Sequence, residues 1–481
     1  MKKNVFKLMC LASIAWSLAA CQNSVDNVND PIAEEGDPTY MALSLSFPAT
    51  QTRTEHDGNA TADEVKIETV DVFVYSDNRV QAYHKTLPVS EFDYDSSTDK
   101  YTTKELIQTT AGLKYVFVGV NFPAALVSEL DGESASQRLA DVGRALDIDA
   151  LKGGGDAFIM CNKTLAQNTL VATASDVTFA TLPGSNKFDI VVTRLASKVS
   201  MQEKSGISYD INEGSFTGLE FALDHINGKS FLLQGSDPNY ADPNWTHAGW
   251  TDNAEGAEAT DVPGPESVVN SGYWDDLVKK TPNGDYKAVV AAGTTPNVHY
   301  LAENTSQPAA LLKGTLTRLI VRTKFLPKEV YIADGSNTTI APVGYAKVTS
   351  ASQSITAPQT FYLVTDNNGF HYYTFDNSLV SGLKTAVEGT VDPLTYTDGY
   401  CYYDLWFNSE EASGNTTQFQ SLRNQYYNYT ISGFKMLGDN TEALDDPDEP
   451  MFEPDTKIAV TLSIEDWELK SKEFTLGEEK Q

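Results

Sequence analysis

The residues of this sequence whose types and spacing indicate chemistry lie near its start, at Leu18-Ala19-Ala20-Cys21. Small residues before a cysteine suit a lipoprotein signal peptidase, and the thiol at the cut then carries a lipid. A positive region containing Lys2, Lys3 and Lys7 precedes an apolar run too short to span a bilayer, which is typical of an export signal. The pattern predicts removal of residues 1–20 and acylation of Cys21. The alternative is an ordinary signal peptide that happens to contain this cysteine.

Gln22 follows the cysteine, where an aspartate would favour retention at the inner membrane. The sequence therefore favours delivery to the outer membrane. Residues 22–38 are polar, acidic and without periodicity, as in a flexible tether.

No motif in the rest of the chain predicts catalysis. The six histidines, at 56, 84, 225, 247, 299 and 371, do not pair at zinc-ligand spacing, and no Cys-x-x-Cys or G-x-S-x-G motif is present. Cys161 and Cys401 are expected to be small buried side chains and not a disulfide. The acidic run at 445–449 favours a solvated linker over a calcium site. We expect no enzymatic activity, and no cofactor or metal beyond the covalent lipid on Cys21.

The composition indicates a globular, exported protein. The chain has 481 residues, of which 41% are hydrophobic and 21% charged, enough for two or three ordinary domains. Its formal net charge of −31 argues against nucleic acid as a partner.

One strand is predicted to be removable. Alternation over residues 40–47 places four apolar side chains on one buried face: Met41, Leu43, Leu45 and Phe47. Pro48 ends the strand, and Arg53 then lies alone in a short polar segment. Cleavage between Arg53 and Thr54 would free the strand and leave a hydrophobic groove in the body of the protein.

Most of the remaining chain is predicted to form strands. They include residues 65–75, 114–122, 157–161, 177–182, 187–192, 311–326, 399–407 and 423–434. Residues 124–151 form the single predicted helical region, with apolar residues at 126, 130, 139, 142 and 146. Asn-Gly pairs at 227–228 and 368–369 predict hairpins. The strand pattern begins again after Arg194, which predicts a domain boundary there.

The C-terminal segment has a face similar to that of the removable strand. Alternation over residues 457–468 places Ile458, Val460, Leu462 and Ile464 on one side, with Trp467 following. Residues 438–455 before it are acidic and contain prolines, so we expect a mobile linker. The segment is therefore a candidate to refill the groove of a neighbouring molecule. The alternative is that it is the final core strand of its own domain.

Five features resemble, in order along the chain, those of the major fimbrial subunits of Bacteroidales, the type V pilins. They are the lipobox at Cys21, residues 52–54 before 62–67, residues 158–161 followed by 194–199, residues 300–304, and residues 423–427 with the terminal 463–468. The resemblance implies an all-β fold with a short helical insertion, built as two tandem transthyretin-like β-sandwich domains.

The resemblance also implies a route of assembly. In this family an arginine-specific or trypsin-like protease removes the N-terminal strand of the lipoprotein precursor, and the C-terminal strand of another copy replaces it. By position, Arg53 is the cut site and Thr54 the mature N-terminus. The partners implied are other copies of the chain, tip and anchor subunits, the protease, and the host or bacterial surface ligands of an adhesive fimbria.

These expectations divide the chain into five parts. They are a signal peptide (1–20), a propeptide with the removable strand (21–53), an N-terminal sandwich (54–195), a C-terminal sandwich (196–455) and a donor strand (456–481). The precursor is expected at the outer membrane and the mature subunit in an extracellular fimbria. The alternative function is a monomeric surface lipoprotein that binds glycans or host proteins, which would have no use for a scissile loop.

Overall fold

The computed structural model describes residues 36–46, 64, 66–77, 81–98, 100–131, 145–147, 157–227, 229–233, 278–279, 286–305, 312–335, 342–409, 418–444, 449–451 and 458–466. These residues form a mainly β protein, which confirms the predicted fold class. The α-helices among them are α2 (Ala124–Leu130) and α7 (Val380–Ala386).

Ten of the described strands before residue 195 form one sheet, which we call the first sheet group. Its main order is β3-β2-β7-β9-β11-β1-β5-β4, and β10 and β6 pair with β7 and β1. The strands are β1 (Pro38–Ser46), β2 (Thr69–Tyr75), β3 (Gln81–Pro88), β4 (Phe92–Asp95), β5 (Lys100–Thr103), β6 (Ile107–Thr110), β7 (Gly112–Val120), β9 (Met160–Asn162), β10 (Ala166–Leu170) and β11 (Lys187–Arg194). Side chains of β1, β2, β7 and β11 share one buried cluster, so the sheet curls around its own core.

Two five-stranded sheets form a second sheet group. One has the order β19-β12-β28-β29, with β20 on β12, and the other the order β13-β14-β21-β27, with β18 on β14. The strands are β12 (Ala196–Glu203), β13 (Asp210–Ile211), β14 (Gly214–Asp224), β18 (Lys287–Ala288), β19 (Val290–Ala291), β20 (Val298–Ala302), β21 (Arg318–Pro327), β27 (Tyr400–Trp406), β28 (Gln425–Phe434) and β29 (Ile458–Asp466).

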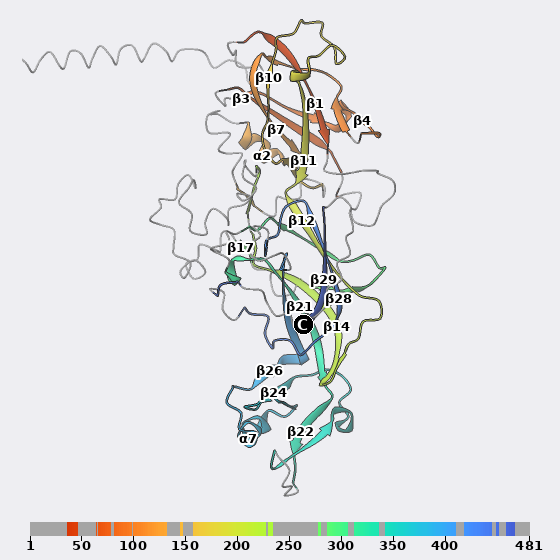
Figure 1. Ribbon diagram of the computed structural model, residues 1–481, viewed down its shortest axis with the longest axis vertical. Helices are drawn as coiled ribbons and strands as arrows, with labels where there is room; N and C mark the ends of the chain where they lie inside the picture. The colour runs from red at the N-terminus through yellow and green to blue at the C-terminus, as the bar shows by residue number, and fades with distance from the viewer. Residues whose placement is uncertain are drawn as a thin grey trace, which may run out of the picture.

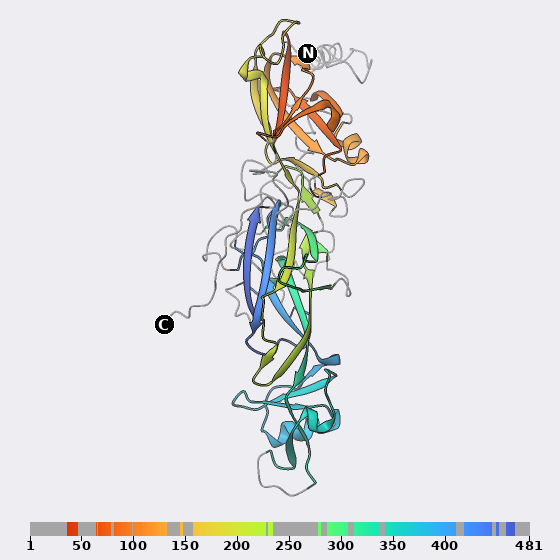
Figure 2. The same cartoon turned by 90° about the vertical axis from the view of Figure 1, so that its right-hand side faces the viewer.

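The two sheets of the second group pack face to face. One buried cluster contains Val199 of β12 and Tyr427 of β28 together with Phe221 of β14 and Val321 of β21. This is the arrangement of a β-sandwich, whose core is made by the inner faces of both sheets. Figure 2 shows β12, β28 and β29 side by side in the middle of the molecule.

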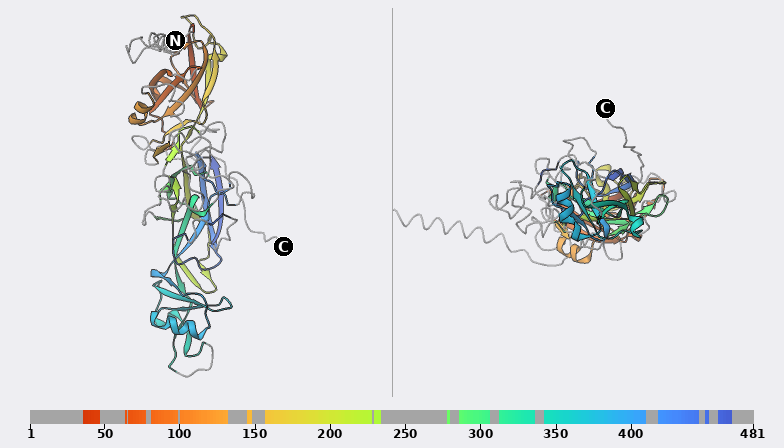
Figure 3. Two further views of the ribbon diagram at one scale, coloured as in Figure 1. Left: turned by 90° about the vertical axis from the view of Figure 1, so that its left-hand side faces the viewer. Right: turned by 90° about the horizontal axis from the view of Figure 1, so that it is seen from below.

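A distal module lies between β21 and β27 in the sequence. It contains α7 and the strands β22 (Glu329–Ala333), β23 (Tyr345–Thr349), β24 (Phe361–Thr365), β25 (His371–Thr374) and β26 (Leu394–Tyr396). The described part is elongated, with the first sheet group at one end, the second in the middle and the distal module at the other end (Figure 1). Figure 3 shows these three tiers stacked along one axis.

The two sheet groups share a packed junction. One buried cluster joins Phe73, Phe117 and Ile159 of the first group to Ala302 and Tyr426 of the second. Beside it, the buried Glu64 carboxylate contacts Lys198 Nζ at 2.9 Å and accepts a hydrogen bond from Tyr300 Oη at 2.5 Å. Burial lowers the pKa of Lys198, while the charge of Glu64 opposes that effect. The groups are therefore connected by packing and by buried polar contacts as well as by the chain.

The sheets change at Leu195, the one residue between β11 and β12. This coincides with the predicted boundary, although the division into two domains remains a prediction. Two short ladders lie outside the main sheets: β15 (Ile226–Asn227) with β17 (Val278–Lys279), and β16 (Lys229–Phe231) with β8 (Ala145–Asp147).

Several predicted elements are wrong. Residues 177–182 form turns and not a strand, because Thr181 N and Leu182 N both bond back to Thr178 O. Of the predicted helical region, α2 holds the buried Leu126 and Leu130, whereas Leu146 lies in β8. The second helix, α7, was not predicted. The pair at 227–228 does not connect a hairpin, because β15 and β16 pair with different strands, whereas the pair at 368–369 does connect β24 to β25.

Candidate functional site: strand β1 and the C-terminal strand

Strand β1 occupies an interior position in the first sheet group. On one side it pairs in parallel with β11, with Leu43 opposite Phe188 and Leu45 opposite Ile190. On the other side it pairs antiparallel with β6 and then with β5. Residues 38–41 therefore pair with β6 alone, residues 42–43 with β11 alone, and residues 44–46 with strands on both sides, so removal of β1 would leave unpaired strand edges on both sides.

The alternating face of β1 is buried as predicted. Met41 and Leu43 have no exposed surface, and Leu45 is 1% exposed. They pack into the core of the first group with Phe188 and Ile190. Phe47 lies outside the described residues. The structure therefore shows that taking β1 out would open a hydrophobic groove.

Polar contacts hold the beginning of β1, and Asn186 is central to them. Its side-chain amide lies 2.9 Å from Thr39 Oγ1, 2.9 Å from Tyr40 O and 3.0 Å from Val171 O. The Thr39 hydroxyl in turn donates to Val171 O at 2.6 Å. Both Thr39 and Asn186 are fully buried. We did not predict this contact from the sequence, in which only the place of Thr39 two residues before Met41 marks it as part of the same face.

The opposite face of β1 is polar. Ser44 Oγ lies 3.1 Å from Thr102 Oγ1 on β5, and Lys100 on β5 forms an ion pair of 2.8 Å with Asp189 on β11. Because Lys100 lies opposite Ser46 and Asp189 opposite Ser44, this pair crosses the outer face of β1. Both partners are exposed, so the ion pair contributes little to stability.

The C-terminal strand β29 lies in its own molecule, antiparallel to β28 at the edge of that sheet. Ile458 is fully buried, Leu462 is 7% exposed, and Val460 is partly buried against the same core. The backbone of Ile464 pairs with Tyr427, whereas the Ile464 side chain and Trp467 lie outside what the structure describes. This is the arrangement expected of a final core strand.

The segment before β29 is held more firmly than we predicted. Residues 438–455 were expected to form a mobile linker, but Asp439 forms a backbone bridge with Tyr402, and Pro450 forms another with Leu312. Met451 is buried in a cluster with Leu316, Trp406 and Phe419. The described part of this segment therefore covers the edge of the second group.

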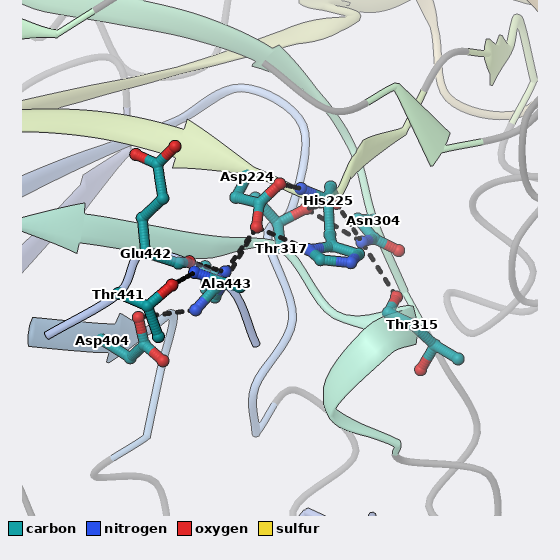
Figure 4. A network of polar contacts seen from close by, with 10 residues as sticks. Asp224, His225, Asn304, Thr315, Thr317, Asp404, Thr441, Glu442 and Ala443 are labelled. Atoms are coloured by element: carbon teal, nitrogen blue, oxygen red, sulfur yellow. Dashed lines mark hydrogen bonds and ion pairs between the residues drawn. The ribbon is translucent and has the colours of Figure 1, made fainter. Parts of the chain in front are cut away.

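A network of polar contacts around Asp224, Asp404 and Glu442 holds the middle of that segment (Figure 4). Arg318 contacts Asp224 and Asp404 at 2.7 Å each and donates to Glu442 O at 2.6 Å. Burial opposes ionisation of Asp224, but His225 and Arg318 outweigh that effect and hold the pKa of Asp224 below its usual range. Burial raises the pKa of Asp404 despite Arg318. The network fixes the backbone near Glu442 to the body of the second group.

The side chains of reactive types elsewhere in the described part of the chain lie in structural surroundings. Cys161 and Cys401 are buried and free, as predicted, and burial raises the pKa of each thiol to about 12. In the part of the chain that the structure describes, no cluster of His, Cys, Asp and Glu could hold a metal ion. The predicted modification sites, Cys21, Arg53 and Thr54, lie outside that part. No described helix is long and apolar enough to cross a membrane.

Two family models match this chain. One, described as major fimbrial subunit protein (FimA), matches residues 39–212, and the other, described as major fimbrial subunit protein type IV, fimbrillin, C-terminal, matches residues 394–473. The first match includes β1 and its groove, and the second includes β28 and β29. The fold and these matches define a fimbrillin-like subunit. The two models describe parts of major fimbrial subunits, which are structural proteins, and each matches this chain over less than half of its length.

Solved structures show more distant likenesses. A protein of Parabacteroides distasonis proposed to act in cell adhesion is 14% identical, with a TM-score of 0.46, and the match covers 90% of this chain and all of the other. The tip fimbrial protein of Porphyromonas gingivalis, truncated at its C-terminus, is 12% identical, with a TM-score of 0.36 and coverage of 89% and 100%. At these values the likenesses carry no further argument. No curated protein matches.

Proposed function

We propose that this chain is exported as a lipoprotein acylated at Cys21, cut between Arg53 and Thr54, and polymerised by strand exchange into an adhesive fimbria. The observation that carries the proposal is the position of β1. It is buried between β11 and the pair β5 and β6, yet it lies on the N-terminal side of Arg53. A cut after Arg53 leaves β1 attached to the body by non-covalent contacts alone.

The exchange is physically reasonable because β29 would move from an edge to an interior position. At the edge it has one ladder of hydrogen bonds, with β28. In the groove of a neighbour it would have two, as β1 has now. Burying three large apolar side chains of β29 in the groove would stabilise the contact by on the order of 6 kcal/mol, before the cost of ordering the strand is subtracted.

The resulting contact would join unlike surfaces of identical copies. Such a contact does not close on itself, so it produces a filament. The uncut β1 would cover the open strand edges during export and prevent premature pairing. Because a cut at Arg53 separates the body from its lipid, this chain suits a stalk or tip position better than that of an anchor subunit. Its partners would be other fimbrial subunits, an arginine-specific or trypsin-like protease, and surface ligands.

The experiment is to shear material from cells, sequence its N-terminus and measure its oligomeric state. The proposal predicts filaments that begin at Thr54. An Arg53→Gln variant should stay as full-length lipoprotein, and Cys21→Ala should lose acylation while still folding. Lipidated monomers that retain residues 21–53 would instead support the monomeric binding protein. Arg194, Arg318 and Arg423 are at most 4% exposed, so an arginine-specific protease should not cut them in the folded protein.

A further inference from the structure

Strand β1 and the C-terminal strand share a pattern that extends beyond their apolar positions. Residues 39–47 read TYMALSLSF, and residues 456–464 read TKIAVTLSI. Aligned in this way, the two segments have the same threonine, alanine, leucine and serine at positions one, four, seven and eight. Position six carries a hydroxyl in both, as Ser44 and Thr461. The apolar alternation alone does not require these polar matches.

The first position of the pattern is the one that Asn186 binds. In the structure, Thr39 is fully buried and its hydroxyl both accepts from the Asn186 amide and donates to Val171 O. The carbonyl oxygen of Asn186 also accepts from Val171 N at 3.0 Å, which fixes the orientation of the side chain. A strand that replaces β1 without a hydroxyl at this point would lose both of these buried hydrogen bonds, although the Asn186 amide would keep its backbone acceptors.

We propose that Asn186 sets the register of strand exchange by binding Thr39 in the precursor and Thr456 of the next copy in the filament. The inference rests on the proposed strand exchange and adds the position at which the incoming strand stops. In this register Ala459 takes the place of Ala42, Val460 that of Leu43 and Leu462 that of Leu45. The incoming strand runs parallel to β11, as β1 does.

Registers shifted by one or two residues are disfavoured, because they lose either the buried apolar face or the polar contact. A shift by one residue turns the apolar face outward. A shift by two residues in one direction places Ile458 against the Asn186 amide. A shift by two in the other direction places Pro454 there, and proline has neither a hydroxyl nor a backbone N–H. Only the register with Thr456 at this point satisfies both the core and the polar contact.

Cysteine pairs test the register directly. Ser44 Oγ and Thr102 Oγ1 are 3.1 Å apart, so Ser44→Cys with Thr102→Cys should form an intramolecular disulfide in the uncut precursor and serve as the control. In filaments, Thr461→Cys should form an intermolecular disulfide with Thr102→Cys. Ser463→Cys, two residues further along, is the matched variant and should not. Cys161 and Cys401 are buried and do not interfere.

The outcomes separate the register from the exchange itself. A crosslink from Ser463→Cys in place of Thr461→Cys would overturn the register and leave strand exchange standing. If neither crosslinks in filaments that do form, the C-terminal strand is not in this groove, and the proposed function fails with the register.

A second measurement isolates the hydroxyl. Thr456→Val keeps the shape but loses the hydrogen bonds, and it leaves β1 and the precursor groove unchanged. We expect the cut Thr456→Val subunit to add to filaments about tenfold more weakly than the wild type, and Thr456→Ser to retain most of the affinity. The thermal stability of the uncut precursor should be the same in all three. Equal affinity of the Val variant would overturn the assignment to Asn186.

Discussion

At the scale of single residues, the junction depends on a charge pair that is almost fully withdrawn from water. Glu64 is 1% exposed and Lys198 is 4% exposed, and Arg194 Nε donates to Glu64 O at 2.9 Å. Glu64 lies ten residues after Thr54 and is therefore retained after the proposed cut. It connects the new N-terminal segment to both sheet groups.

Removing one partner of this pair should be costly. Glu64→Ala leaves the Lys198 ammonium buried without its counter-charge, so we expect a loss of about 3–5 kcal/mol in the free energy of unfolding. The matched control is Glu68→Ala, whose ion pair with Lys66 is exposed and should contribute about 0–1 kcal/mol. Both values follow from chemical denaturation. Equally small losses of unfolding free energy in the two variants would contradict a stabilising role for the buried pair.

A histidine in the first group gives a pH dependence. His84 lies 3.4 Å from Asp71 and 3.1 Å from Asp131, and its ring stacks on Phe73. Burial lowers the pKa of His84, but the two carboxylates outweigh burial and raise it overall. Because the folded pKa exceeds the unfolded value of about 6.5, the contribution to stability is complete below that pH and is lost as the pH rises through the folded pKa.

The expected result is a larger fall in stability with alkaline pH for the wild type than for His84→Gln. Free energies of unfolding at about pH 6 and about pH 9 provide the comparison. A wild-type profile that is parallel to that of the variant would show that the two carboxylates do not hold the proton on His84.

At the scale of elements, the sequence predicted β1, β2, β7, β11, β27, β28 and β29, because each has an alternating or continuous apolar pattern. It did not predict that β1 pairs in parallel with β11, since the two strands are far apart in the chain and nothing local specifies their contact. Residues 177–182 have a strand-like composition, yet local turn bonds from Thr178 determine their conformation. The fixed position of the segment before β29 was not predicted, because its polar composition gives no sign of its contact with Arg318.

The residues of the candidate site also differ in how far the sequence predicts them. The burial of Met41, Leu43 and Leu45 was predicted correctly, because burial on one face follows from the period of two. Thr39 and Asn186 were missed because a polar contact between distant residues leaves no periodic signal in the sequence. The edge position of β29 also depends on tertiary pairing that the pattern alone does not specify.

A pair of core substitutions distinguishes the two strands. Leu43→Ala should destabilise the uncut precursor by about 2–5 kcal/mol, because it opens a cavity beside Phe188, but it should leave cut filaments unchanged since β1 has left. Leu462→Ala is the matched variant and should weaken the filaments. Guanidinium unfolding of the precursor and dissociation of the filaments give the two readouts. Filaments weakened equally by Leu43→Ala would show that β1 stays in place.

At the scale of the whole molecule, the groove and the C-terminal strand belong to different tiers. The groove lies in the first sheet group, at one end, whereas β29 lies in the second (Figure 1). Strand β1 runs in the same direction as β11, which leads into β12 and the second group. An incoming strand with this direction would enter from the far end of the first group, so successive copies would be joined end to end.

The most direct test of the account uses a chain that ends at Lys457. After cleavage at Arg53 such a subunit has a groove but no strand to donate, and circular dichroism establishes that it is folded. Filament length in electron micrographs is the measurement, for the shortened chain alone and mixed with the wild type. The account predicts no filaments from the shortened chain alone and progressively shorter filaments in the mixtures, because each shortened copy accepts a strand and ends growth. Filaments of normal length from the shortened chain alone would contradict it.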